Sequence, residues 1–164
     1  MLEYLHMNPS HFVLFVLRIT IGWYFFYAGI TKVLNPNWSA AGFLNNAKTF
    51  PEFYAWFTQP DILPWINMLN EWGLTLVGIA LILGIGVRIA SISGIALLLL
   101  YYFPVLQFPY VKTTSYYLVD EHIIISLLLL YFAAVRAGRT WGLERWCSNL
   151  PLCSRFPMLR ALIG

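Results

Sequence analysis

Three consecutive ionisable residues, Asp120, Glu121 and His122, stand directly before an unbroken apolar run that ends near Val135. Carboxylates and an imidazole are side chains that commonly transfer protons in reactions. Ionisable residues inside apolar segments often mark functional sites. We therefore expect this group to exchange protons. The alternative is structural, because acidic side chains in a first turn stabilise the helix dipole, and His122 could be a hydrogen-bonded histidine at the edge of the apolar region.

Two other apolar segments carry charge in a regular pattern. Residues recur at intervals of three and four, which places them on one face of a helix. These faces are Arg18, Gly22, Phe25, Gly29 and Lys32 in the first segment, and Glu71, Thr75, Gly78 and Ile82 in the second. Glycines let helices approach closely, and charges avoid lipid. We expect both faces to point into a helical bundle, where Arg18 and Glu71 either act functionally or form a structural pair.

The sequence shows no metal, haem, flavin or iron–sulfur signature. Asp120, Glu121 and His122 are consecutive, so they point in different directions around a helix and cannot all bind one metal ion. Cys147 and Cys153 are separated by five residues, a spacing that matches no redox or zinc motif. We predict no metal site and two free thiols.

The composition places these residues in a membrane. Of the 164 residues, 60% are hydrophobic and only 10% are charged, whereas soluble domains have about 25% charged residues. The net charge is only +3 and no run is rich in Lys or Arg, so nucleic acid is not an expected partner. We predict a single-domain, all-α integral membrane protein, residues 1–164, in contact with membrane lipids.

Four apolar segments are expected to span the membrane as an antiparallel four-transmembrane-helix bundle. They cover about residues 12–34, 68–87, 89–108 and 117–135, each near the ~20 residues that a spanning helix needs. The run after His122 is too short to cross, so the fourth helix should begin near Tyr116, which places Glu121 about 7 Å inside the boundary. We predict that Glu121 faces the bundle near Glu71, while Asp120 faces the wet rim.

Basic residues are unevenly divided between the two ends of such a bundle. One end holds Arg88, Arg136, Arg139, Arg145, Arg155 and Arg160, and the other holds Lys32, Lys48 and Lys112. Because Lys and Arg accumulate on the cytoplasmic side, the first end, with both termini, is predicted to be cytoplasmic.

The segments outside the apolar runs are also unusual. The connection 35–67 is rich in aromatic residues, which favour the headgroup layer. We expect an interfacial helix from about Ala41 to Phe57, interrupted at Pro51, which either anchors the chain or covers a pocket. Residues 138–164 are expected to form an amphipathic cytoplasmic tail along the inner surface.

Three stretches resemble the DoxX-like membrane proteins. They are LRITIGWYFFYAGITKVLNP (17–36), EWGLTLVGIALILGIGVRIAS (71–91) and AGRTWGLERW (137–146). The first stretch carries an Arg, spaced glycines and the pattern Gly-x-x-Lys. The second begins with a Glu and ends in a Gly-rich segment that leads to an Arg. The third resembles the motif that follows the fourth helix in these proteins. The residues that match are Arg18, Gly29, Lys32, Glu71, Gly78, Arg88, Arg139 and Trp141.

The resemblance implies a four-helix fold in a prokaryotic inner membrane. DoxD-type members of the family oxidise thiosulfate and reduce membrane quinone, whereas others are accessory proteins of redox or stress-response complexes. We expect a quinone-linked oxidoreductase subunit; the alternatives are an accessory subunit of a larger membrane complex and a carrier of lipid or small molecules. The expected catalytic residues are Glu71, Glu121 and His122, and the expected quinone-binding residues are Arg18, Lys32 and Tyr117. Thiosulfate is a dianion, and the carboxylates at the outer end disfavour it.

Overall fold

The computed structural model describes residues 9–106 and 118–144, and these residues form helices joined by turns. The elements are α1 (Pro9–Val33), α2 (Ala41–Asn45), α3 (Pro51–Trp56), α4 (Leu63–Leu83), α5 (Val87–Val105), α6 (Glu121–Val135) and a short 3-10 helix, η2 (Ala137–Arg139). Helices α1, α4 and α5 are long and apolar enough to cross a membrane, whereas α6 has 15 residues. Within the described residues, the chain is a helical membrane protein with three candidate spans.

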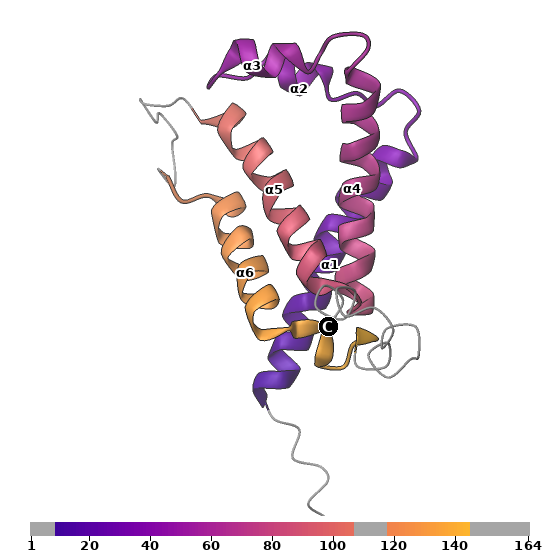
Figure 1. The fold of residues 1–164 in the computed structure, drawn as a ribbon, viewed down its shortest axis with the longest axis vertical. Helices are drawn as coiled ribbons and strands as arrows, with labels where there is room; N and C mark the ends of the chain where they lie inside the picture. The colour runs from indigo at the N-terminus through magenta and orange to yellow at the C-terminus, as the bar shows by residue number, and fades with distance from the viewer. Residues whose placement is uncertain (1–8, 107–117, 145–164) are drawn as a thin grey trace, which may run out of the picture.

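The long helices pack side by side in the order α1, α4, α5, α6 (Figure 1). Gly22 approaches Ile82 and Gly29 approaches Thr75, so α1 and α4 run in opposite directions. Gly94 of α5 lies between Val77 of α4 and Leu129 of α6. The short helices α2 and α3 lie across one end of these helices, and η2 lies at the opposite end (Figure 1).

The two helical faces predicted from the sequence meet where α1 packs against α4. The buried residues of α1 include Arg18, Gly22, Phe25 and Gly29, in agreement with the predicted face. On α4, Thr75 and Gly78 are buried. A methyl group at Gly78 would overlap the backbone of Phe26, so the two backbones touch without side chains between them. Close packing of this kind stabilises helix pairs in membranes.

Replacing Gly78 with Ala should therefore separate α1 from α4. Overpacking costs about 1–3 kcal/mol, so we expect Gly78→Ala to lower the unfolding temperature of the protein in detergent, followed by tryptophan fluorescence. Gly42→Ala is the matched control, because no atom lies within 4 Å of a Cβ placed at Gly42. Equal unfolding temperatures for the two variants would show that the backbones do not touch.

The turn between α4 and α5 is short, as expected from the two apolar segments that are separated only by residue 88 in the sequence. Gly84 and Gly86 have φ angles of 65° and 62°, in the left-handed region that glycine adopts without strain. The backbone N–H of Gly84 caps the carboxyl end of α4. These two glycines therefore reverse the chain within a few residues.

Helix α6 begins later than expected. It starts at Glu121, and residues 118–120 are not helical, so the prediction that the helix extends back to Tyr116 is wrong for the described residues. Asp120 is the N-cap, and its Oδ1 accepts a hydrogen bond from the Ile123 N–H at 3.2 Å. A side-chain cap satisfies a backbone donor that would otherwise lack a partner, and this sets the start of the helix. Residues Tyr116 and Tyr117 lie outside the described residues.

Helix α4 begins earlier than expected, at Leu63 rather than near residue 68, with a proline in its first turn. The aromatic connection forms the two short helices α2 and α3 rather than one interrupted helix, and α3 begins at Pro51, where the interruption was predicted. The predicted tail falls largely outside the described residues, which end at Glu144.

Candidate functional site

The candidate site residues fall into two groups at opposite ends of the helices. Lys32, Glu71 and His122 lie toward the end covered by α2 and α3, whereas Arg18 is fully buried near the other end. Fourteen residues separate Arg18 from Lys32 along α1, which corresponds to about 21 Å. The structure therefore does not bring Arg18 together with the other predicted residues.

Lys32 is the centre of a polar contact that joins three helices. Its Nζ donates hydrogen bonds to Asn70 Oδ1 of α4 at 2.8 Å and to the Tyr101 hydroxyl of α5 at 3.1 Å. The ammonium also lies over the rings of Trp38, at 4.9 Å from the centroid, and Tyr101, at 5.3 Å. Glu71, which is half-buried, interacts with Lys32 electrostatically. These contacts hold a cation in a partly apolar setting.

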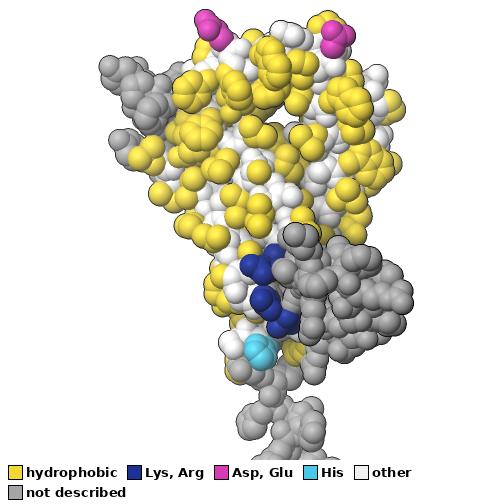
Figure 2. Space-filling view, viewed as in Figure 1, with side chains coloured by type: hydrophobic (Ala, Val, Ile, Leu, Met, Phe, Trp, Pro, Cys, Tyr) yellow, Lys and Arg dark blue, Asp and Glu magenta, His cyan; other side chains and the backbone are white. Residues whose placement is uncertain are grey.

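A pocket of about 230 Å³ lies beside this lysine. Asn70 and Tyr101 contribute polar groups to its wall. Most of the remaining wall is apolar and aromatic, and includes Trp38, Phe43, Leu44, Tyr54, Phe57 and Ile66. The molecular surface is hollowed beneath the end formed by α2 and α3 (Figure 2). Apolar pockets with a few placed polar groups are typical of sites for small molecules.

Hydrogen bonds to both neighbouring helices hold the α2–α3 segment over the pocket. The Ala40 N–H donates to Asn67 Oδ1 of α4 at 2.9 Å. The Tyr54 hydroxyl donates to the Leu100 carbonyl of α5 at 3.3 Å, and the Lys48 N–H bonds to the Pro104 carbonyl at 3.0 Å. Burial raises the pKa of the Tyr54 hydroxyl, so it remains protonated and can donate at neutral pH. The α2–α3 segment is thus fixed to α4 and α5 at several points.

His122 adjoins Tyr101 and is oriented by Asp120. Its Nδ1 lies 2.7 Å from Asp120 Oδ2, so the carboxylate can accept a hydrogen bond from the Nδ1–H group. The ring centroids of His122 and Tyr101 are 6.4 Å apart, and Tyr102 lies at the same distance from the imidazole. This arrangement fixes the orientation of the imidazole ring beside the two tyrosines.

Glu121 does not face the bundle, so the prediction of its orientation is wrong. Glu121 is exposed, and Ile124, which lies three residues later on the same side of α6, is 58% exposed. Asp120 is the half-buried carboxylate. The physical reason is the cap, because Asp120 must turn back over the first turn to reach the Ile123 N–H, and Glu121 then points about 100° away.

The second polar group, around Arg18, includes a residue that was not predicted. Glu144 is 1% exposed and Arg18 is 0% exposed, and the two interact electrostatically. Burial raises the pKa of the Glu144 carboxyl, and Arg139, Arg136, Arg18 and Arg88 oppose this rise. Arg18 Nη2 donates to the Trp141 carbonyl at 3.4 Å. A buried arginine needs an acid nearby, and Glu144 is the only acid in residues 137–146.

Glycines make room for this group. A Cβ at Gly84 or Gly142 would collide with the Arg18 guanidinium, and one at Gly138 would collide with the Glu144 carboxylate. The chain after η2 bonds to the end of α4, through Leu143 N–H to the Leu83 carbonyl at 3.0 Å and Glu144 N–H to the Gly84 carbonyl at 2.9 Å. The three sequence stretches quoted above thus meet at one place.

Substitutions at Glu144 should destabilise the fold. Glu144→Ala leaves Arg18 buried without this carboxylate. Removing the partner of a buried charge lowers the free energy of unfolding by about 3 kcal/mol. We expect a clearly lower unfolding temperature in detergent, and partial recovery when Arg18→Met is added. Glu52→Ala, at an exposed position in α3, is the control. If Glu144→Ala unfolds at the same temperature as Glu52→Ala, the carboxylate does not stabilise Arg18.

The described residues define a small helical membrane protein with an aromatic pocket at one end and the buried side chains of Arg18 and Glu144 at the other. The DoxX family model matches residues 13–107, more than half of the chain, and the protein belongs to the DoxX family. No curated protein and no solved structure matches it. Among the described residues, no group of three or more His, Cys, Asp or Glu side chains could hold a metal ion.

Proposed function

We propose that this protein binds a membrane quinone in the pocket beside Lys32 and acts as the quinone-binding subunit of a membrane oxidoreductase. The observation that carries the proposal is the contact of Lys32 Nζ with Asn70 Oδ1 and the Tyr101 hydroxyl at the wall of an aromatic pocket. A quinone has a flat apolar ring and two carbonyl acceptors. Aromatic side chains suit the ring, and the ammonium and hydroxyl groups suit the carbonyls.

The same end of the molecule offers groups for proton transfer. Reduction of a quinone to a quinol takes up two electrons and two protons. We assign one proton to His122, which Asp120 holds next to Tyr101. We assign the other to Glu71, which interacts electrostatically with Lys32, and the exposed Glu121 would exchange protons with the outside. The electrons would come from a substrate, of which thiosulfate is one candidate, or from a partner subunit.

We further propose that α6 forms a fourth membrane-spanning helix, and that α2 and α3 lie in the outer interface. On the face shown in Figure 2, the basic side chains lie at one end and the acidic ones at the other. Arg88, Arg136 and Arg139 lie at the ends of α5, α6 and η2 that share the basic end. The bias of Lys and Arg toward the cytoplasm supports a prokaryotic inner-membrane protein with both termini inside.

This topology can be tested by labelling single cysteines in intact cells. The background variant replaces Cys147 and Cys153 with Ser. A cysteine at Asn45, which is exposed in α2, should react with a membrane-impermeant maleimide, whereas one at Thr140 should react only after the cells are opened. The reverse pattern would place the pocket at the cytoplasmic side.

Quinone binding can be measured by quenching of tryptophan fluorescence, because Trp38 lines the pocket. A short-tailed quinone should quench the purified protein. Lys32→Met and Tyr101→Phe should each weaken binding about tenfold, since a hydrogen bond to a charged group contributes about 1.5–3 kcal/mol. His122→Gln should retain binding but reduce quinone turnover by the intact complex.

Lys48→Met and Tyr131→Phe serve as controls, because both residues are exposed outside the pocket. Equal affinity in the pocket variants and the controls would contradict the proposal. Two other results would replace it. A protein that binds no quinone and co-purifies with a larger complex would be an accessory subunit, and one that moves lipid between vesicles would be a carrier.

A further inference from the structure

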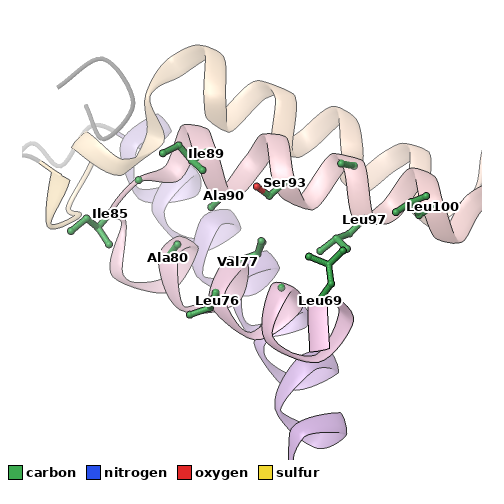
Figure 3. Close-up of a pocket in the computed structure, with 13 residues that line it drawn as sticks. Leu69, Leu76, Val77, Ala80, Ile85, Ile89, Ala90, Ser93, Leu97 and Leu100 are labelled. Carbon is green, nitrogen blue, oxygen red and sulfur yellow. The ribbon is translucent and has the colours of Figure 1, made fainter. Parts of the chain in front are cut away.

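A second and larger cavity, of about 540 Å³, lies between α4 and α5 (Figure 3). Ser93 provides the only side-chain hydroxyl among the residues that line it, and the others are apolar or glycine. Small residues of both helices, including Gly73, Ala80, Ala90 and Ala96, make the space. Figure 1 shows α4 and α5 diverging from their common turn toward the end covered by α2 and α3. We call this cavity the α4–α5 groove.

The α4–α5 groove continues from the pocket beside Lys32. Leu69, Leu97 and Leu100 line both cavities, so no polar wall separates them. From Leu69 the groove extends along α4 to Ile85, at the turn before α5. The helical part of this path, from Leu69 to Leu83, corresponds to about 21 Å. The site thus has a polar head region at Tyr101 and a long apolar extension toward the opposite end.

We propose that the ligand of this site is an amphiphile whose hydrogen-bonding ring lies beside Lys32 and whose long apolar chain lies in the α4–α5 groove. This inference rests on the proposed function and adds the substrate class, a quinone with a long isoprenoid tail. The pocket beside Lys32 suits the ring of such a molecule, and the α4–α5 groove that adjoins it suits the apolar tail. The groove excludes a polar tail, because a buried polar group would find almost no hydrogen-bond partner there.

The size of the groove also favours a chain over a helix of a partner. A helix with its side chains is about 10 Å wide, so a 21 Å length of it occupies about 1,600 Å³. The groove has about 540 Å³. A narrow flexible chain fits this space, whereas a helix would remain largely outside it.

Tail length is the variable that tests the inference. Wild-type protein in lipid nanodiscs is titrated with quinones of one and four isoprenoid units, with concentrations expressed as mole fraction in the lipid. We expect the long-tailed quinone to bind about tenfold more tightly. Ser93→Phe, which fills the groove, should remove this advantage and leave the affinity for the short-tailed quinone unchanged.

Ile92→Phe is the matched control, because Ile92 is adjacent in α5, is 64% exposed and does not line the groove. It should behave as wild type. Gly73→Leu is the second groove variant, since a Cβ there meets only Leu97 Cδ1 at 3.4 Å, and it keeps the test open if Ser93→Phe does not fold. A photoreactive group at the tail end of the long quinone should label residues near Ile85 and Ile89.

The outcomes separate the two proposals. If the short-tailed quinone fails to bind wild type, the proposed function fails. If it binds and the long-tailed quinone binds equally, with no effect of Ser93→Phe, the quinone site stands and the tail inference is overturned. A groove filled only by bulk phospholipid, with label spread over all lipid-facing helices, would also overturn it.

Discussion

The direct backbone contact between α1 and α4 fixes both polar groups of this protein. Gly29 and Gly78 allow the two helices to touch, and each end of this contact carries charge. Lys32 follows Gly29 by one turn and reaches Asn70, while Arg18 precedes Gly22 by one turn and reaches the backbone of Gly84 and Gly142. A shift of α1 along α4 by one turn, about 5 Å, would break both contacts together. The small residues therefore set a register as well as a distance.

The apolar middle of the bundle separates two groups that suit different tasks. The group at Lys32 lies beside a pocket, and its side chains come from three helices. The group at Arg18 and Glu144 is closed, because glycines and the returning chain pack around it. Buried charges enclosed in this way suit a structural part, whereas a half-buried lysine beside an aromatic pocket suits a ligand. The quinone proposal accordingly rests on the first group and assigns Arg18 to the fold.

Periodicity in the sequence was sufficient to predict the helical faces of α1 and α4, and the apolar runs gave the approximate helix positions. It was not sufficient for contacts that depend on tertiary structure. The orientation of Glu121 was missed because the Asp120 carboxylate caps the helix. One local hydrogen bond, from the Ile123 N–H to Asp120 Oδ1, determines which of the two acidic side chains is turned inward. Asn70 and Tyr101 were missed because nothing local distinguishes Tyr101 from the other nine tyrosines. The burial of Glu144 depends on residues more than a hundred positions away.

That last separation has a consequence for synthesis. Arg18 and Trp141, whose carbonyl it contacts, are 123 residues apart. At about 5–20 residues per second, α1 leaves the ribosome some 6–25 s before its buried arginine can meet the segment that encloses it. During this interval the guanidinium must keep water or lipid phosphate as its partner, because an unpaired charge in hydrocarbon is costly. The first helix of this protein is therefore expected to keep this arginine near a membrane surface until residues 141–144 have been made and pack around it.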